Sequence, residues 1–406
     1  MKTIVFLGTN KSGSSRDAIK AAENLGYFTV LLTNRSRFLE QREEFPEVHH
    51  MEYIDLHDDR KIREALEKFQ DRGFILQTIA SFIEPFVYKA AILSEEFCQT
   101  NLSTDAIFTM ENKIYTRDAL SHLSSTPDFF IYKHDEPLDE FISQHQSKLP
   151  LIVKSPDSTG SKDVILAKNN EDFQLAMKSL LSKYPDAPVL VEEYLEGPQY
   201  LVETVIRNGK LEIIGIVEQT IEKKERFIVI GYLMNPFPNT ELYIDLYNAI
   251  NPIMKELEMA NGAAHFEFRK VKNKWKLIEV NPRVSGGVMN KLIQASTGIN
   301  LMEETLKLFL GEEPSFTPIK GRYSYAHYLT VDQEGFIKKI TGKSRASRYE
   351  GVEHVYVKPR KGQRVRSPLS MGHRYGYVLA SDNQKEEAIK IAQQASQEIE
   401  FHILEE

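Results

Sequence analysis

Short apolar runs alternate with helically spaced apolar residues through the N-terminal part of the chain. The pattern predicts strands at 3–8, 28–32 and 74–79 and helices at 14–25, 62–69 and 84–97. Gly26, directly after the first helical segment, is a plausible C-terminal cap. Because strands and helices alternate, we expect a parallel sheet covered by helices.

From about residue 150 the apolar runs are joined by shorter turns. Strands are predicted at 151–154, 163–168 and 189–194 around a helix at 171–181, and then at 200–207, 210–219 and 227–233. Asn208-Gly209 is a strong hairpin signal, so the latter strands should be antiparallel. A helix at 241–259, strands at 262–271 and 274–280, helices at 287–295 and 301–310, and a strand-rich end with a helix at 385–399 follow.

Composition narrows the class of protein. The 406 residues are 41% apolar and 27% charged, which is typical of globular chains and excludes wholly disordered, collagen-like or coiled-coil proteins. Apolar runs such as 4–7 are far shorter than the roughly 18–20 residues that span a membrane. Cys98 is the single cysteine, so no intrachain disulfide or cysteine metal site can form. We expect a cytoplasmic protein without a signal peptide, and the net charge of −7 argues against a nucleic-acid binder.

The loop after the first strand has the sequence Gly8-Thr-Asn-Lys-Ser-Gly-Ser-Ser15. It is similar to a dinucleotide-binding turn but lacks the G-x-G-x-x-G spacing. A tight strand-to-helix turn and a loop that contacts a small substrate both remain open.

Two lysines precede polar segments that suit phosphate binding. Asn112-Lys113 leads into a predicted helix, and Lys154 ends a strand before the loop Ser-Pro-Asp-Ser158-Thr159-Gly160-Ser161. Such a loop offers backbone N–H groups and hydroxyls to a polyphosphate, and a lysine adds a point charge. The alternative is an ordinary polar hairpin loop.

The apolar strand 189–191 continues into Glu192-Glu193-Tyr194-Leu195. Glu192 could accept a hydrogen bond from the exocyclic amine of adenine, while backbone groups near Tyr194 and Leu195 read the ring edge. Solvated acids at the end of a strand are the simpler alternative.

The sharpest pattern is His265-Phe-Glu267 on one strand and Glu279-Val-Asn281-Pro-Arg283 on the next. The two-residue period of a strand puts His265 and Glu267 on one face, and Glu279 and Asn281 on one face. If the strands pair across the turn 272–274, three oxygen ligands converge, and these suit Mg²⁺, which commonly takes further ligands from substrate phosphates and water. Arg283 would then face the same phosphates.

In order and spacing, these motifs resemble those of the ATP-grasp superfamily of ADP-forming carboxylate–amine ligases. The resemblance implies an α/β protein with an N-terminal Rossmann-like domain with a parallel sheet (1–104), a central two-lobed ATP-binding α+β domain (105–312), and a C-terminal strand-rich domain similar to that of biotin carboxylase (313–406). Within the superfamily the chain looks most similar to L-amino acid ligases, which make dipeptides. The string Pro-Arg-Val-Ser285-Gly286-Gly287 supports that narrower resemblance.

The resemblance also implies roles for individual residues. Lys113 and Lys154 would contact the ATP phosphates, and the 158–163 loop would close over them as a lid. The adenine and ribose would be held by 192–195 and Gln199, that is, by Glu192, Glu193, Tyr194, Leu195 and Gln199. Glu267, Glu279 and Asn281 would bind Mg²⁺, with Mn²⁺ as the alternative ion. Arg283 would stabilise the acyl phosphate, with Lys154 as the second catalytic group, and the substrate would be contacted by Arg283, Ser285, Gly286, Gly287 and Arg374.

The chain departs from the superfamily's sequence pattern at a few positions, and these differences bear on the identity of the substrate more than on ATP binding. Many relatives carry Pro-Glu where this chain has Pro198-Gln199, and the missing acid leaves Glu203 as a substitute for contacting ribose. Gln219 and Tyr232 stand where many relatives have Lys and His.

The resulting expectation is an ATP- and Mg²⁺-dependent ligase acting on small amino-acid substrates, without nucleic-acid or membrane partners; a homodimer is compatible with the sequence. A carboxylase-like enzyme that activates bicarbonate and a nucleotide-binding regulator without turnover are the alternatives. Residues 338–374 contain eleven Lys or Arg and two Glu, a net charge of +9 that leaves −16 for the remainder. This run suits a solvated face or a field that attracts anionic substrates better than nucleic acid, since few aromatic residues are interleaved.

Overall fold

The computed structural model describes residues 1–156, 163–223, 227–237, 240–368 and 370–404. Its N-terminal part contains the predicted parallel sheet, in the strand order β3-β2-β1-β4. The strands are β1 (Lys2–Leu7), β2 (Phe28–Thr33), β3 (His50–Tyr53) and β4 (Ile75–Ala80). The helices are α1 (Ser14–Asn24), α2 (Ser36–Glu40), α3 (Asp59–Asp71) and α4 (Val87–Cys98), with a 3₁₀ turn at Arg42–Glu44.

Three features of this part differ from the sequence-based expectation, and one of them is the short helix α2, which was not predicted. Strand β3 was not predicted, because it is an edge strand whose residues are all partly exposed and show no buried alternation. Helix α4 begins at Val87 rather than Glu84. Glu84 therefore lies in the connection after β4, where its side chain can reach across to another part of the chain.

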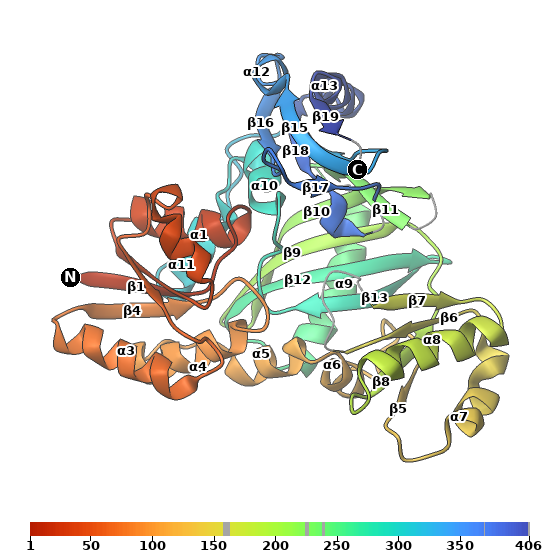
Figure 1. The fold of residues 1–406 in the computed structure, drawn as a ribbon. Coiled ribbons are helices and arrows are strands. Elements are labelled where there is room, and N and C mark those ends of the chain that lie inside the picture. The colour runs from red at the N-terminus through yellow and green to blue at the C-terminus, as the bar shows by residue number, and fades with distance from the viewer. Residues whose placement is uncertain (157–162, 224–226, 238–239, 369, 405–406) are drawn as a thin grey trace.

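A small antiparallel sheet forms one lobe of the central region, in the order β5-β8-β6-β7. It consists of β5 (Phe129–Tyr132), β6 (Leu151–Lys154), β7 (Val164–Ala167) and β8 (Val189–Glu193). Its helices α7 (Leu138–His145) and α8 (Asn170–Lys183) lie together beside the sheet, at the lower right of Figure 1. A 3₁₀ turn at Gln146–Lys148 follows α7, while α5 (Thr104–Glu111) and α6 (Lys113–Ala119) lead from the N-terminal part to this lobe.

The second lobe is built on an eight-stranded sheet, in the order β13-β12-β9-β10-β11-β14-β18-β16. It comprises β9 (Gln199–Arg207), β10 (Lys210–Lys223), β11 (Phe227–Met234), β12 (Gly262–Val271), β13 (Lys274–Asn281), β14 (Tyr323–Leu329), β16 (Val352–Val357) and β18 (Gly376–Asp382). Helices α9 (Thr240–Glu256), α10 (Met289–Thr297) and α11 (Leu301–Phe309) contact strands of this sheet. Because β11 pairs with β14, the sheet runs across the domain boundary expected at 312–313.

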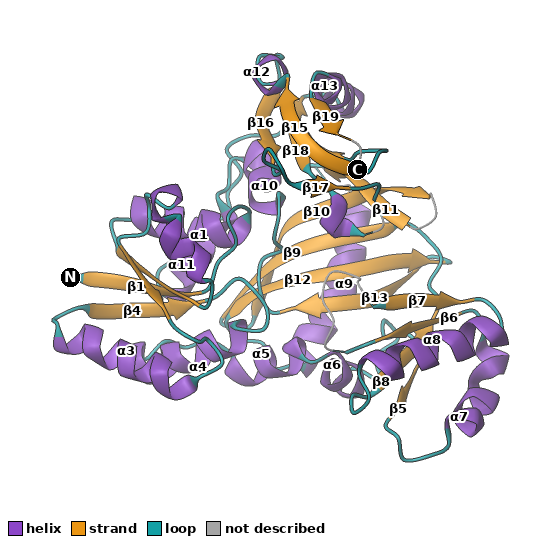
Figure 2. Ribbon diagram, in the orientation of Figure 1, coloured by secondary structure: helices purple, strands orange, loops and turns teal. Residues whose placement is uncertain are grey.

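The strand-rich C-terminal part completes the molecule (Figure 2). A three-stranded sheet in the order β17-β15-β19 is formed by β15 (Gly335–Thr341), β17 (Arg364–Val365) and β19 (Glu400–Leu404). Helices α12 (Lys343–Ala346) and α13 (Lys385–Gln397) and a 3₁₀ turn at Met371–His373 belong to the same region.

Both predicted hairpin turns are confirmed. Asn208 and Gly209 have φ angles of 49° and 73°, and they join β9 to β10. Lys272 and Asn273 have φ angles of 46° and 64°, and they join β12 to β13. Positive φ at both central residues is the signature of the type I′ turn, whose twist matches that of the flanking strands. The second turn fixes the register of the strands that carry the candidate metal ligands.

Candidate active site

The pairing of β12 with β13 brings the predicted metal ligands together. Glu267 lies opposite Glu279, and His265 lies opposite Asn281. Phe266 and Phe268 point into the core on the other side of β12, where both are fully buried. The two carboxylate side chains stay about a quarter exposed, at 27% for Glu267 and 28% for Glu279. Apolar residues on one face thus leave the polar set on the other.

A β-bulge between β12 and β13 affects which side chains of β13 lie on the polar face. The register shifts between Glu267 and Phe268, which pairs with Leu277, so that Ile278 is the extra residue on β13. The carbonyl oxygens of Leu277 and Ile278 accept hydrogen bonds from the Arg117 guanidinium, at 3.1 and 2.6 Å. The bulge keeps Glu279 on the polar face while Leu277 and Val280 remain in the core.

Helix α6 places Lys113 beside the candidate metal ligand Glu279. The Asn112 side chain accepts hydrogen bonds from the N–H groups of Ile114 and Tyr115 and so caps the helix. Lys113 Nζ lies 3.4 Å from Glu279 Oε1 and donates to the carbonyl of Pro156 at 3.2 Å. A small cavity lies at this point, and it is lined by Lys113, Thr116, Arg117, Lys154, Ile278, Glu279 and Val280. The structure therefore unites two predicted phosphate-binding lysines with a predicted metal ligand.

Lys154 belongs to a buried charge cluster between the two lobes. Its Nζ lies 2.7 Å from Glu192 Oε2, and Arg117 Nε lies 2.6 Å from Glu192 Oε1. Burial alone would raise the pKa of Glu192, but the two cations outweigh it and lower that pKa. For Lys154, burial lowers the pKa because it disfavours the charged form, and Glu192 opposes that effect. Both oxygens of the Glu192 carboxylate are thus engaged by cations, so the predicted hydrogen bond from adenine to this side chain would compete with these ion pairs.

Sequence reasoning did not identify Arg117. It follows Lys113 by one helical turn on α6, so the two cations share one helix face. That spacing was a usable signal, although a buried arginine cannot be told from a surface arginine in a seven-residue helix without the tertiary contacts.

The rest of the predicted adenine and ribose segment borders the metal-ligand face. Glu193 pairs with Lys276 at 3.4 Å, and the Tyr194 N–H donates to Pro150 O at 3.2 Å. The Leu195 side chain is buried, and its carbonyl accepts from Arg269 at 3.0 Å. Gln199 donates to Glu267 Oε2 at 3.0 Å, which ties this segment to the candidate metal site. Ser158, Thr159, Gly160 and Ser161 of the predicted lid lie outside the described residues.

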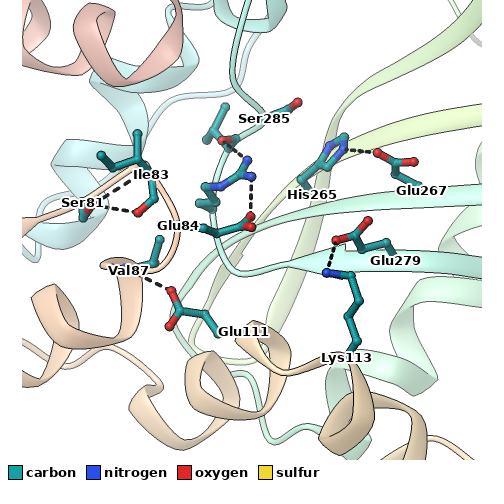
Figure 3. A network of polar contacts seen from close by, with 12 residues as sticks. Ser81, Ile83, Glu84, Val87, Glu111, Lys113, His265, Glu267, Glu279 and Ser285 are labelled. Carbon is teal, nitrogen blue, oxygen red and sulfur yellow. Dashed lines mark hydrogen bonds and ion pairs between the residues drawn. The ribbon is translucent and has the colours of Figure 1, made fainter. Parts of the chain in front are cut away.

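Arg283 contacts the N-terminal part of the chain. Its Nη2 forms an ion pair with the Glu84 carboxylate, which is labelled in Figure 3, and its Nη1 donates to Val284 O at 3.3 Å. The Arg283 Nε atom is buried and has no hydrogen-bond partner among the described residues. Glu84 was not identified from the sequence, because its neighbour Arg283 is distant along the chain and nothing local marks the pair.

His265 and Glu203 hold the segment that follows Arg283. His265 Nδ1 lies 2.6 Å from Glu203 Oε1, and the other Glu203 oxygen accepts from the Ser285 N–H at 3.1 Å. Burial opposes protonation of His265, but Glu203 and Glu267 raise its pKa to about 10. Glu203 is fully buried and both of its oxygens are engaged by His265 and Ser285, which argues against the expected contact with ribose.

The N-terminal glycine loop packs against this same segment. Ser14 Oγ donates to the Ser285 carbonyl at 2.5 Å. A Cβ atom on Gly13 would lie 2.8 Å from the Gly287 nitrogen, so the two backbones meet without room for a side chain. Gly286 and Gly287 remain exposed. The loop is therefore a tight turn that also borders the predicted substrate site.

Arg374 is stacked on tyrosine rings near Gly287. Its guanidinium carbon lies 3.8 Å from the Tyr328 ring centroid and 5.7 Å from that of Tyr232. Two nitrogens, Nε and Nη1, are buried without a hydrogen-bond partner in the described part of the chain. The Tyr328 hydroxyl is 4.0 Å from a Cβ placed on Gly287. A contact between Arg374 and substrate stays a prediction, but its orphaned donors suit a carboxylate.

The donor set suits Mg²⁺ as long as a nucleotide completes the coordination. No group of three His, Cys, Asp or Glu side chains able to hold a metal occurs in the described ranges. The candidate set has two carboxylates and the Asn281 amide, and Mg²⁺ commonly takes its remaining ligands from phosphates and water.

In the described part of the chain, no helix has both the length and the apolar character needed to cross a bilayer.

Two family models and a curated relative match parts of the chain. The ATP-grasp domain model matches residues 147–291, and the model of the L-amino acid ligase C-terminal domain 2 matches residues 327–403. The protein y4rH of Sinorhizobium fredii is 29% identical over 262 residues, covering 63% of this chain and 53% of that protein. The chain thus spans about half the length of this curated relative.

Solved structures share the fold over its whole length. The L-amino acid ligase from Bacillus licheniformis has a TM-score of 0.81 at 21% identity, covering 100% of this chain and 99% of that one. The biotin carboxylase domain of the Hydrogenobacter thermophilus 2-oxoglutarate carboxylase, solved with MgADP and bicarbonate, has a TM-score of 0.74 at 15% identity, covering 99% and 90%. This chain therefore has the fold of the ATP-grasp ligases, and its residues 147–291 and 327–403 match the models of the ATP-grasp domain and of the L-amino acid ligase C-terminal domain 2.

Proposed function

We propose that the protein is an ADP-forming ligase that joins an amino-acid carboxylate to an amine through an acyl phosphate, and that it makes dipeptides from L-amino acids. ATP is the phosphoryl donor, and Mg²⁺ is the metal. The observation that carries the proposal is the convergence of Glu267, Glu279 and Lys113 on paired strands and an adjoining helix within one polar face.

The chemistry requires two displacement steps. A carboxylate oxygen attacks the γ-phosphorus of ATP, and ADP leaves as the acyl phosphate forms. The amine nitrogen then attacks the acyl carbon, loses a proton to solvent or a base, and expels inorganic phosphate. Both steps depend on positioning and on neutralising negative charge.

The residues divide this work. Lys113 and Lys154 bind the phosphates, and Glu192, 2.7 Å from Lys154 Nζ, opposes the burial that lowers the pKa of this lysine. Glu267, Glu279 and Asn281 would hold Mg²⁺, which when bound neutralises phosphate charge. Gln199 orients Glu267 through its 3.0 Å hydrogen bond.

Arg283 contributes a guanidinium to the acyl-transfer centre. Its ion pair with Glu84 orients the side chain, and its buried Nε is a donor that no described residue engages. The His265–Glu203 pair anchors Ser285 at 3.1 Å, so the substrate segment 283–287 is held from behind. We assign substrate contacts to Arg283, Ser285, Gly286, Gly287 and Arg374.

We further propose that the chain is divided into an N-terminal domain (1–104), an ATP-grasp domain (105–312) and a C-terminal domain (313–406). The substrate site then lies where all three approach, since Glu84, Arg283 and Arg374 come from different domains. The direct pairing of β11 with β14 makes the last two domains one structural unit in the sheet.

The test is release of ADP and inorganic phosphate from ATP across a panel of amino acids. They are supplied singly and in pairs, with and without bicarbonate, and the products are analysed by mass spectrometry. Release that needs a pair of amino acids and yields a dipeptide supports the proposal.

Two other outcomes would contradict it. Release that depends on bicarbonate would favour a carboxylase-like enzyme, an alternative supported by the fold shared with the biotin carboxylase domain. ATP binding without any release would favour a regulator.

A further inference from the structure

A second, larger cavity lies between the N-terminal part and the C-terminal part of the chain. It has a volume of about 780 Å³ and is bordered by the glycine loop, α2, the end of β16 and Gly287. A cleft of this size falls within the range that small-molecule ligands occupy. It is separate from the small cavity that Lys113, Lys154 and Glu279 line.

The cleft is strongly basic. Glu44 is the one acidic residue in its lining, whereas the basic residues are Lys11, Arg35, Arg37, Lys358 and Arg360. Glu44 Oε2 pairs with Arg360 at 2.7 Å and with Lys11 at 3.1 Å. These bonds, that from Arg360 first, lower the pKa of Glu44, so its charge is already shared between two cations.

Among the residues that the structure describes, the other three cations have no acidic partner. Arg35 donates to two neutral oxygens, Thr9 O and Asn10 Oδ1, both at 3.1 Å. Arg37 and Lys358 form no ion pair with any residue in the described ranges. A concave surface with such an excess of one charge concentrates oppositely charged ligands. The cleft is therefore complementary to an anion with more than one negative oxygen.

The cleft opens beside the segment to which we assign acyl transfer. Gly287 forms part of its wall and closes the run that begins at Arg283. Ser12, also in the wall, donates to the Tyr356 hydroxyl at 2.9 Å, which ties the glycine loop to β16. The cleft therefore adjoins the assigned substrate segment 283–287 at Gly287.

We propose that one of the two amino-acid substrates carries an additional anionic group, a side-chain carboxylate or a phosphate ester, and that this basic cleft binds it. The inference rests on the proposed ligase function and narrows it to acidic substrates. Arg35, Arg37 and Lys358 supply the unpaired charge, and Lys11 and Arg360 become available as the anion competes with Glu44.

Binding can be measured without turnover, by calorimetric titration of the full chain at low ionic strength, where screening is weak. The probes are L-glutamate against L-glutamine, and O-phospho-L-serine against L-serine. We expect at least one acidic probe to bind about tenfold or more tighter than its neutral counterpart, about 1.4 kcal/mol. Preference for glutamate identifies a carboxylate ligand, and preference for O-phosphoserine identifies a phosphate ester.

The discriminating variant is the double substitution Arg37→Ala/Lys358→Ala. Both side chains are exposed and form no ion pair within the described part of the chain, so the fold should be retained. The matched control is Lys338→Ala/Lys339→Ala, which removes two exposed charges from the same basic run outside the cleft. The cleft variant should lose the preference for the acidic probe, and the control should keep it.

Equal binding of acidic and neutral probes, or equal loss in both double variants, would overturn the proposal. ADP release from pairs of neutral amino acids, without any preference for acidic ones, would also overturn it while leaving the ligase function intact. Selective binding of an acidic probe with no ADP release from any pair would instead support the anion site and contradict the ligase function.

Discussion

The buried cluster of Glu192, Lys154 and Arg117 makes a sharp prediction about Glu192→Gln. The wild-type carboxylate faces two cations at 2.7 and 2.6 Å, and all three side chains are less than one-tenth exposed. The neutral amide leaves both cations buried without an opposite charge. Breaking a buried ion pair by removing one partner costs about 3–5 kcal/mol. Because the amide still offers an oxygen to one cation, we expect the lower end, about 3 kcal/mol.

The substitution should also weaken ATP binding. Glu192 opposes the effect of burial on the pKa of Lys154, so its loss lowers that pKa further and reduces the charge available to phosphate. The matched control is Glu193→Gln on the same strand, where a 37% exposed carboxylate lies 3.4 Å from Lys276. A surface pair of this kind contributes at most about 1 kcal/mol.

Urea denaturation followed by far-UV circular dichroism, together with the KM for ATP, measures both effects. We expect Glu192→Gln to be less stable than Glu193→Gln by about 2 kcal/mol or more, the difference between a buried and a surface pair. Equal stability of the two variants, with a raised KM for ATP only in Glu192→Gln, would refute this reasoning. It would instead indicate that the carboxylate serves mainly to contact adenine.

Three further predictions concern the proposed chemistry. Glu267→Gln and Glu279→Gln should each abolish Mg²⁺-dependent ADP release with little change in circular dichroism, because Mg²⁺ favours carboxylate oxygens; near-normal rates at saturating Mg²⁺ would remove the metal assignment. Lys154→Ala should raise the KM for ATP and lower kcat, since phosphate loses a nearby charge, and unchanged kinetics would leave the lysine a structural role only. Arg283→Lys should lower kcat about 10²–10³-fold, as the loss of a preorganised donor does, with a modest change in the KM for ATP; an effect confined to KM for an amino acid would assign Arg283 to substrate docking.

The local elements of this protein were largely determined by its sequence. Two hairpins were predictable because Asn208, Gly209 and Asn273 tolerate the left-handed backbone that a tight turn needs. The shared face of Glu267 and Glu279 followed from the two-residue period of a strand together with the pairing across the second turn. These are short-range consequences of backbone geometry, so no tertiary information was required.

Tertiary structure decided which charges meet. Arg117 with Glu192, Glu84 with Arg283, and Glu203 with His265 are pairs far apart in the chain, and none has a local sequence signal. The basic run of the C-terminal part became informative only when Lys358 and Arg360 were placed opposite the N-terminal loop. Electrostatic interactions depend on distance and burial in three dimensions, and periodicity along the chain specifies neither of them across domains.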